Sequence, residues 1–237
     1  APYNSTFCLY LETNKGKLYG STNYPQICDL GADSNDWVSF IEGYNGVTPD
    51  DWETGTVSLS NKGITDLPIS NYPTNIAGSI ILNTNSLANI NSLSNITSLS
   101  GSLQLYNNNL TNISGLSNLT SVGNQFYLQH NNITDLTPLN NLTTVGGYFS
   151  VRDNPNLTSL SGLESLTSVN GSDSYFDQNP LLDDISGIQN ATITSIILFD
   201  DKDYSVKVPY NSPFCLNVEA NKGKLYGSTN YPQICDL

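Results

Sequence analysis

The sequence predicts a solenoid, a chain wound into stacked coils that pair through parallel strands. Three observations lead to this fold class. Most of the chain is a series of similar segments, each with the pattern L-x-L-x-x-N-x-L followed by an apolar residue at about every third position. These segments start at residues 78, 101, 124, 147 and 171, so the period is 23, 23, 23 and then 24 residues. A segment with two cysteines occurs at both ends of the chain. Self-similarity of this kind is typical of repeat architectures.

The L-x-L element of each segment predicts a short strand. Alternate residues of a strand face the same side, so both apolar side chains face the core. The later apolar positions recur every three residues, which favours a chain turning around a flat coil, with short helical or 3-10 turns on the convex side. A parallel sheet is expected on the other face. No single coil can bury its own apolar side, so the coils must stack.

The asparagine in the middle of each segment predicts a buried ladder. The chain leaves strand geometry at this position, where backbone N–H and C=O groups need partners. A side-chain amide has two donors and two acceptors, so it can satisfy these groups and bond the next asparagine in the stack. The alternative is that these are surface residues of an Asn-rich chain. The ladder residues are Asn85, Asn108, Asn131, Asn154 and Asn179.

The two ends of the chain carry copies of one segment. Residues 1–30 recur at 208–237 with 25 of 30 positions identical, which is expected of one unit of a tandem array followed by the start of the next. Four cysteines allow three pairings, and the repeated spacing favours Cys8–Cys28 and Cys215–Cys235 over buried reduced thiols. We therefore expect an N-terminal cap at 1–55, the solenoid at 56–206 and a C-terminal cap at 207–237. Disulfide bonds indicate an extracellular or cell-surface location.

The composition excludes several classes of function. A formal charge of −13 argues against nucleic acids and anionic membranes, which both need a basic surface. No apolar run approaches the roughly 18 residues of a membrane span, so no membrane insertion is expected. One histidine and four paired cysteines leave little material for catalysis. We therefore expect no catalytic residue and no cofactor. We also expect no metal site, because the acidic clusters lack the spacing of known calcium loops.

Two stretches resemble known repeats. Residues 133–143, ITDLTPLNNLT, resemble the repeat of bacterial internalins, which are secreted leucine-rich-repeat proteins. Residues 154–169 are similar to the repeats of receptor L-domain-like proteins. The resemblance covers about 56–206 and implies a curved or gently twisted leucine-rich-repeat solenoid that binds through its strand face. The caps depart from those families, because a Cys-bearing segment replaces a helical cap or an immunoglobulin-like tail. The identity of the partner is therefore not implied.

The outward strand positions predict a ligand-binding face in two columns. The first column is Ser58, Ile81, Gln104, Tyr127, Ser150, Tyr175 and Ile197, and the second is Ser60, Asn83, Tyr106, Gln129, Arg152, Asp177 and Phe199. Tyrosine and arginine are enriched in binding hot spots. The alternative is that tyrosine is simply common here and favoured on strands. Arg152 could bind a ligand carboxylate or only pair with Asp177. The predicted face consists of Gln104, Tyr106, Tyr127, Gln129, Arg152, Tyr175 and Asp177.

These features predict a non-catalytic binding or adhesion module of a tandem-repeat cell-surface protein. Its partner would be a protein or glycan on another surface. Neighbouring copies of the same unit would flank this module in the full-length chain. The main alternative is a structural spacer that extends a distal adhesive domain. A third reading is ice or mineral binding by the threonine row Thr97, Thr120, Thr143 and Thr167. The sequence does not name the ligand, the organism or the number of units.

Overall fold

The computed structural model describes residues 56–65, 67, 74–171, 173–193, 196–200, 204–220 and 234–236. The expected N-terminal cap at 1–55 lies outside these residues. The same holds for the Cys8–Cys28 disulfide, which stays a prediction that peptide mapping without reduction would check.

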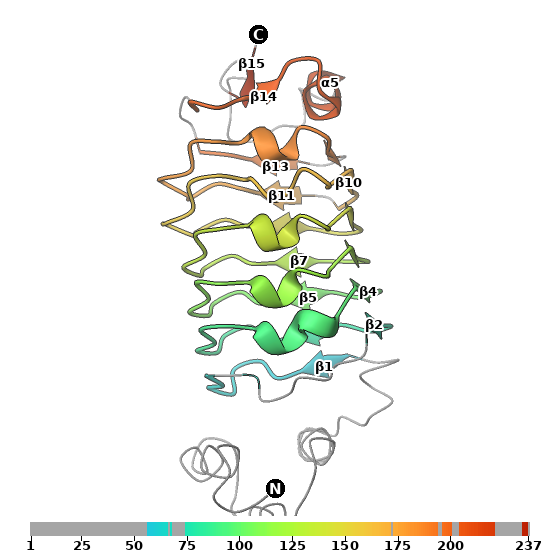
Figure 1. Ribbon diagram of the computed structural model, residues 1–237, viewed down its shortest axis with the longest axis vertical. Coiled ribbons are helices and arrows are strands. Elements are labelled where there is room, and N and C mark those ends of the chain that lie inside the picture. The colour runs from blue at the N-terminus through green and yellow to red at the C-terminus, as the bar shows by residue number, and fades with distance from the viewer. Residues whose placement is uncertain are drawn as a thin grey trace, which may run out of the picture.

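Seven short strands form the main parallel sheet, one from each successive coil (Figure 1). In order they are β1 (Val57–Ser58), β3 (Ile80–Ile81), β5 (Leu103–Gln104), β7 (Phe126–Tyr127), β9 (Phe149–Ser150), β11 (Asp173–Tyr175) and β13 (Ile196–Leu198). Each strand pairs in parallel with the one from the next coil, for example Leu103 with Phe126. The expected leucine-rich-repeat solenoid is confirmed.

A second parallel sheet is an addition to the single sheet that we expected. Each of its six strands comes a few residues before a strand of the main sheet, and the chain turns a corner between the two. They are β2 (Asn75–Ile76), β4 (Ser98–Leu99), β6 (Ser121–Val122), β8 (Thr144–Val145), β10 (Ser168–Val169) and β12 (Thr192–Ile193). Each of these strands buries a single apolar residue, for example Val122 or Val145, so the sequence shows no L-x-L alternation there.

Short 3-10 turns complete the coils, as expected (Figure 1). They are η1 (Asn91–Asn95), η2 (Ser114–Leu116), η3 (Thr137–Leu139) and η4 (Ser186–Ile188). Glycine at the second position of η2 lets adjacent coils approach closely. A Cβ atom on Gly115 would lie 1.8 Å from the carbonyl oxygen of Ile90 in the preceding coil.

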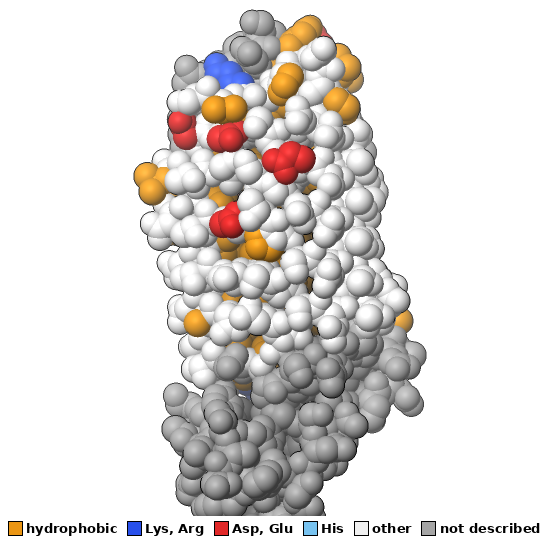
Figure 2. Space-filling model, in the orientation of Figure 1, with side chains coloured by type: hydrophobic (Ala, Val, Ile, Leu, Met, Phe, Trp, Pro, Cys, Tyr) orange, Lys and Arg blue, Asp and Glu red, His pale blue; other side chains and the backbone are white. Residues whose placement is uncertain are grey.

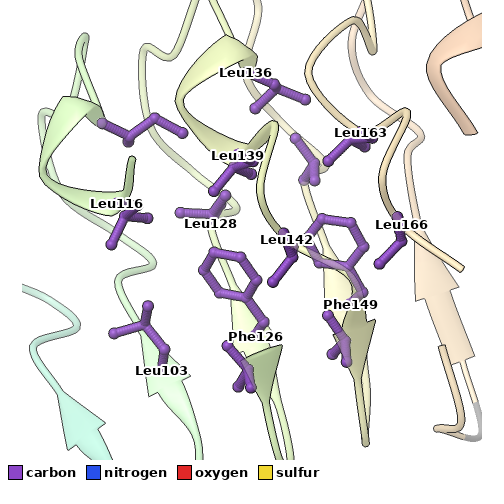
Figure 3. Close-up of a cluster of buried hydrophobic side chains, with 14 of the residues drawn as sticks. Leu103, Leu116, Phe126, Leu128, Leu136, Leu139, Leu142, Phe149, Leu163 and Leu166 are labelled. Carbon is purple, nitrogen blue, oxygen red and sulfur yellow. The ribbon is translucent and has the colours of Figure 1, made fainter. Parts of the chain in front are cut away.

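Apolar side chains of the main sheet and the 3-10 turns fill the space inside the coils (Figure 3). Residues of the second sheet, such as Val122 and Val145, belong to the same core. A row of aromatic rings runs along this core. Phe126 and Phe149 stack with centroids 5.4 Å apart, and Phe149 meets Phe176 edge-on at 5.8 Å. Phe176 in turn stacks on Phe199 at 5.1 Å. Each coil therefore buries its apolar side chains against its neighbours.

The predicted outward positions of the last strand, β13, are wrong by one residue. Tyr175 pairs with Leu198 rather than with Ile197. Ile197 and Phe199, which we placed on the outer face, therefore point inward and are 2% and 3% exposed. A slip of one residue moves every side chain of a strand to the other face. In the preceding strand Ser174 takes the inward position, where other coils have an apolar residue, and this break in the pattern obscured the register.

The ladder asparagines bond the backbone of two successive coils. In Asn131, Nδ2 donates to the carbonyl oxygens of Leu105 (3.1 Å) and Leu128 (3.0 Å). Its Oδ1 accepts from the backbone N–H of Leu110 at 3.1 Å. The same pattern holds at Asn108 and Asn154. In the coils described, these amides bond backbone groups rather than one another, which differs from the stacked amides that we expected.

The residue before each ladder asparagine has a left-handed backbone. The φ angles lie between 53° and 59° at Thr84, Asn107, His130, Asp153 and Gln178. This conformation turns the chain out of the strand, so that the next side chain points into the coil. Asparagine and aspartate adopt it readily, whereas a β-branched residue is strained.

The left-handed position leads to a stability prediction at Thr84. Replacing Thr84 with Asn should stabilise the protein by about 1 kcal/mol, because it removes a β-branched residue from φ +57°. Urea unfolding followed by circular dichroism measures the change. The exposed Thr111 is the matched control, and Thr111→Asn should change the free energy of unfolding by less than about 0.5 kcal/mol. A loss of stability in Thr84→Asn would contradict the strain argument.

The Cys-bearing segment packs against the last coil at the C-terminal end of the solenoid (Figure 1). Helix α5 (Pro213–Ala220) contacts β12, and β14 (Val208–Pro209) pairs with β15 (Cys235–Asp236). Cys215 and Cys235 form a disulfide bond. The backbone N–H of Phe214 donates to the carbonyl oxygen of Gln189 at 3.2 Å, and the Phe214 side chain is buried.

Candidate ligand-binding face

The outer surface of the main sheet brings the seven predicted residues together. Gln104, Tyr127 and Tyr175 lie on β5, β7 and β11, and the register of the sheet places Ser150 between the two tyrosines. The remaining four, Tyr106, Gln129, Arg152 and Asp177, follow two residues later in successive coils. All seven side chains are half-buried. We call these seven residues the strand face.

Sequence reasoning missed a third column on the same side. Gln125, Tyr148 and Asp173 lie two residues before the first column, so the alternation of the strand turns them outward as well. Nε2 of Gln104 donates to Oε1 of Gln125 at 3.1 Å. The sequence contained this signal, because positions 125, 127 and 129 are alternate residues and therefore face the same side of a strand.

Tyrosine rings contact one another across three coils of this face. The rings of Tyr106 and Tyr127 meet edge-on with centroids 6.1 Å apart. Tyr127 and Tyr148 are 6.4 Å apart and tilted. Burial raises the pKa of Tyr127 above its ordinary value, and the neighbouring Tyr148 raises it further. The phenol is therefore a neutral hydrogen-bond donor at physiological pH.

Arg152 forms an ion pair within the face. Its Nη2 lies 3.1 Å from Oδ2 of Asp177, and the two side chains are 28% and 16% exposed. The guanidinium carbon also lies 5.4 Å from the ring centroid of Tyr175, which is a cation–π distance. Burial raises the pKa of the Asp177 carboxyl, while the nearby Arg152 lowers it. The single arginine of the chain is thus already neutralised by Asp177.

Several covered polar atoms of this region have no hydrogen-bond partner. They are Oε1 of Gln129, Oγ of Ser150, Nε of Arg152 and Oδ1 of Asp177. An unsatisfied covered group typically costs about 1–3 kcal/mol. Such groups are rare in folded proteins and need an explanation when they gather in one place. Hydrogen bonds to a ligand would provide one.

The threonine row proposed for ice or mineral binding uses its hydroxyl groups within the protein. Oγ1 of Thr120 donates to the carbonyl oxygen of Thr97 at 2.8 Å, and Thr143 repeats the contact with Thr120 at 2.9 Å. Thr97 and Thr167 bond the preceding coil in the same way. Each hydroxyl proton is therefore directed along the stack rather than outward.

The single histidine of the chain and the carboxylate of Asp200 also bond within the fold. His130 pairs through Nδ1 with the carboxylate of Asp153 in the next coil. Oδ1 and Oδ2 of Asp200 accept backbone N–H groups of Gln178 and Asn179. Within the residues that the structure describes, no group of three or more His, Cys, Asp or Glu side chains could hold a metal ion. In the same part of the chain, no helix has the length and apolar character needed to cross a membrane.

The side that carries the 3-10 turns offers less to a partner. Its visible surface is mostly uncharged and polar, with small separate apolar spots, and carboxylates lie in the C-terminal half (Figure 2). Large apolar side chains that are exposed include Leu181, Val206, Tyr210 and Leu216, all near the C-terminal end.

Comparisons with known proteins find similar solved structures but no matching family and no matching curated protein. Among solved structures, the chain is similar to an internalin from Listeria monocytogenes, with a TM-score of 0.44 and 20% sequence identity. The match covers 71% of this chain and 56% of the internalin.

Proposed function

We propose that this chain is a non-catalytic binding or adhesion module of a tandem-repeat cell-surface protein. Its strand face engages a protein or glycan on another surface. The observation that carries the proposal is the gathering of tyrosine rings, one ion pair and unsatisfied polar atoms on adjacent coils of one sheet.

The distribution along the sheet supports this proposal over a general abundance of tyrosine. The first two coils have neither aromatic nor charged residues at the same positions, which are occupied by Ser58, Ser60, Ile81 and Asn83. Aromatic and charged side chains begin at Tyr106 and continue to Asp177. The strand face is therefore a local feature of the central coils.

The extracellular location rests on the cysteines. Cys215 and Cys235 form a disulfide bond, which persists in oxidising compartments. The second copy of this segment at residues 1–30 supports neighbouring copies of the same unit in a longer chain.

Removal of two anchors of the strand face tests the proposal. The 237-residue chain would be applied to glycan and peptide arrays, and we expect binding to at least one partner. The double variant Tyr127→Ala/Arg152→Ala should weaken that binding by about tenfold or more, since large aromatic and arginine side chains dominate most interfaces. Tyr210→Ala, at an exposed tyrosine far from the face, is the control and should bind normally. Undiminished binding by the double variant would place the site elsewhere.

A structural spacer remains the second candidate, favoured by the near-identical end segments. A spacer needs copies of uniform length rather than a ligand. It predicts that the chain binds nothing on either array, while the melting temperature stays that of a well-folded protein.

A further inference from the structure

We propose that the ligand of the strand face is a neutral carbohydrate. It would bind at the cluster of Gln129, Arg152 and Asp177, which we call the polar cluster, beside Tyr127 and Tyr175. This inference rests on the proposed function and adds the chemical class of the ligand.

The charge of the polar cluster argues against an anionic ligand. Arg152 pairs with Asp177 at 3.1 Å, so a ligand carboxylate would have to displace a carboxylate that is already in place. The chain carries a formal charge of −13, which repels acidic partners at a distance. A ligand without charge avoids both penalties. A carboxylate ligand, one reading of the sequence, is therefore disfavoured.

The unsatisfied atoms define what the ligand must provide. Nε of Arg152 is a donor, whereas Oε1 of Gln129 and Oδ1 of Asp177 are acceptors. These residues lie on three successive coils, with strands about 4.8 Å apart. A matching ligand must accept one hydrogen bond and donate two over a short distance. Neighbouring sugar hydroxyl groups do this, because each hydroxyl both donates and accepts.

An extended peptide fits this arrangement less well. The N–H and C=O groups of a strand point sideways, so a peptide strand pairs with the edge of a sheet rather than with its outer face. The polar cluster lies on central coils, with the sheet continuing on both sides. A protein partner would need to offer its own polar side chains at the same spacing.

The tyrosines complete the match to a sugar ring. Tyr127 and Tyr175 flank Ser150 in the register of the sheet, next to the polar cluster. The face of an aromatic ring is electronegative, so it attracts the weakly positive C–H groups on one side of a pyranose.

The polar atoms are covered in the unbound protein, so binding requires side chains to turn. Gln129 has a long, unbranched side chain with several rotamers, so it can turn while Arg152 stays paired with Asp177. Hydrogen bonds to the ligand would satisfy the three unpaired groups of the polar cluster. The ligand thus selects the opened rotamers.

The test uses the full 237-residue chain with three sets of compounds: neutral oligosaccharides of glucose, galactose, mannose and N-acetylglucosamine, sialylated or sulfated glycans, and linear peptides. We expect binding within the neutral set. Calorimetry should give a dissociation constant that is nearly the same in 50 and 500 mM NaCl, because no net charge is paired. Gln129→Ala and Asp177→Ala should each weaken binding by about tenfold, whereas the control Tyr210→Ala should not.

The outcomes separate this inference from the proposed function. Binding only to peptides or acidic glycans, lost in Tyr127→Ala/Arg152→Ala, would overturn the carbohydrate class and leave the binding face in place. Neutral-sugar binding that survives both Gln129→Ala and Asp177→Ala would also overturn it. Absence of binding in all three sets would overturn both proposals.

Discussion

Replacing Asn131 with Ala should destabilise the protein by about 3–5 kcal/mol, since several buried backbone groups lose their side-chain partner at once. The amide holds the carbonyl oxygens of Leu105 and Leu128 and the N–H of Leu110. The side chain is only 4% exposed, so water cannot readily replace it. Chemical unfolding monitored by circular dichroism measures the loss.

The neighbouring Asn132 provides the control. It is exposed, and its backbone N–H bonds the carbonyl oxygen of Leu110 whatever its side chain. Asn132→Ala should change the free energy of unfolding by less than about 0.5 kcal/mol. Equal effects of the two substitutions would show that the ladder is not the source of the stability.

Gly115→Ala should cost about 3 kcal/mol, near the upper end for overpacked positions. The new Cβ atom would lie 1.8 Å from the carbonyl oxygen and 2.6 Å from the carbonyl carbon of Ile90. Both are backbone atoms, so relief requires adjacent coils to separate rather than a side chain to rotate. Hydrogen exchange should then quicken at amides near this contact, such as Leu93 and Leu116, before the rest of the solenoid.

Gly63→Ala is the control for this second prediction. Gly63 has a φ of +66° but no heavy atom within 4 Å of the added Cβ. The substitution should therefore cost only the left-handed backbone penalty, roughly 1–2 kcal/mol. If both variants lose the same stability, the contact with Ile90 is not what requires glycine at position 115.

The strand face was only partly predictable. The alternation in the sequence placed Tyr127 and Arg152 outward, and the structure has them half-buried on one surface. The ion pair between Arg152 and Asp177 was one of two readings, because the sequence does not say which partner a guanidinium takes. The column of Gln125, Tyr148 and Asp173 extends the same alternation by one step, and it could have been found by following the pattern toward the N-terminus.

The sequence by itself determined the stacked coils, the period and the identity of the core. This information is local and repeated: every coil must bury the same positions, so Leu103, Phe126 and Phe149 recur at the same place in each segment. The tertiary structure alone decided three further matters. The two-residue strands of the second sheet depend on hydrogen bonds between coils and leave no pattern of their own. The last strand has the register that stacks Phe199 on Phe176, a contact between coils that the sequence did not reveal because Ser174 interrupts the apolar repeat. The partner of Arg152 on the strand face is also decided by stacking, which brings Nη2 of Arg152 within 3.1 Å of Oδ2 of Asp177, 25 positions later in the sequence.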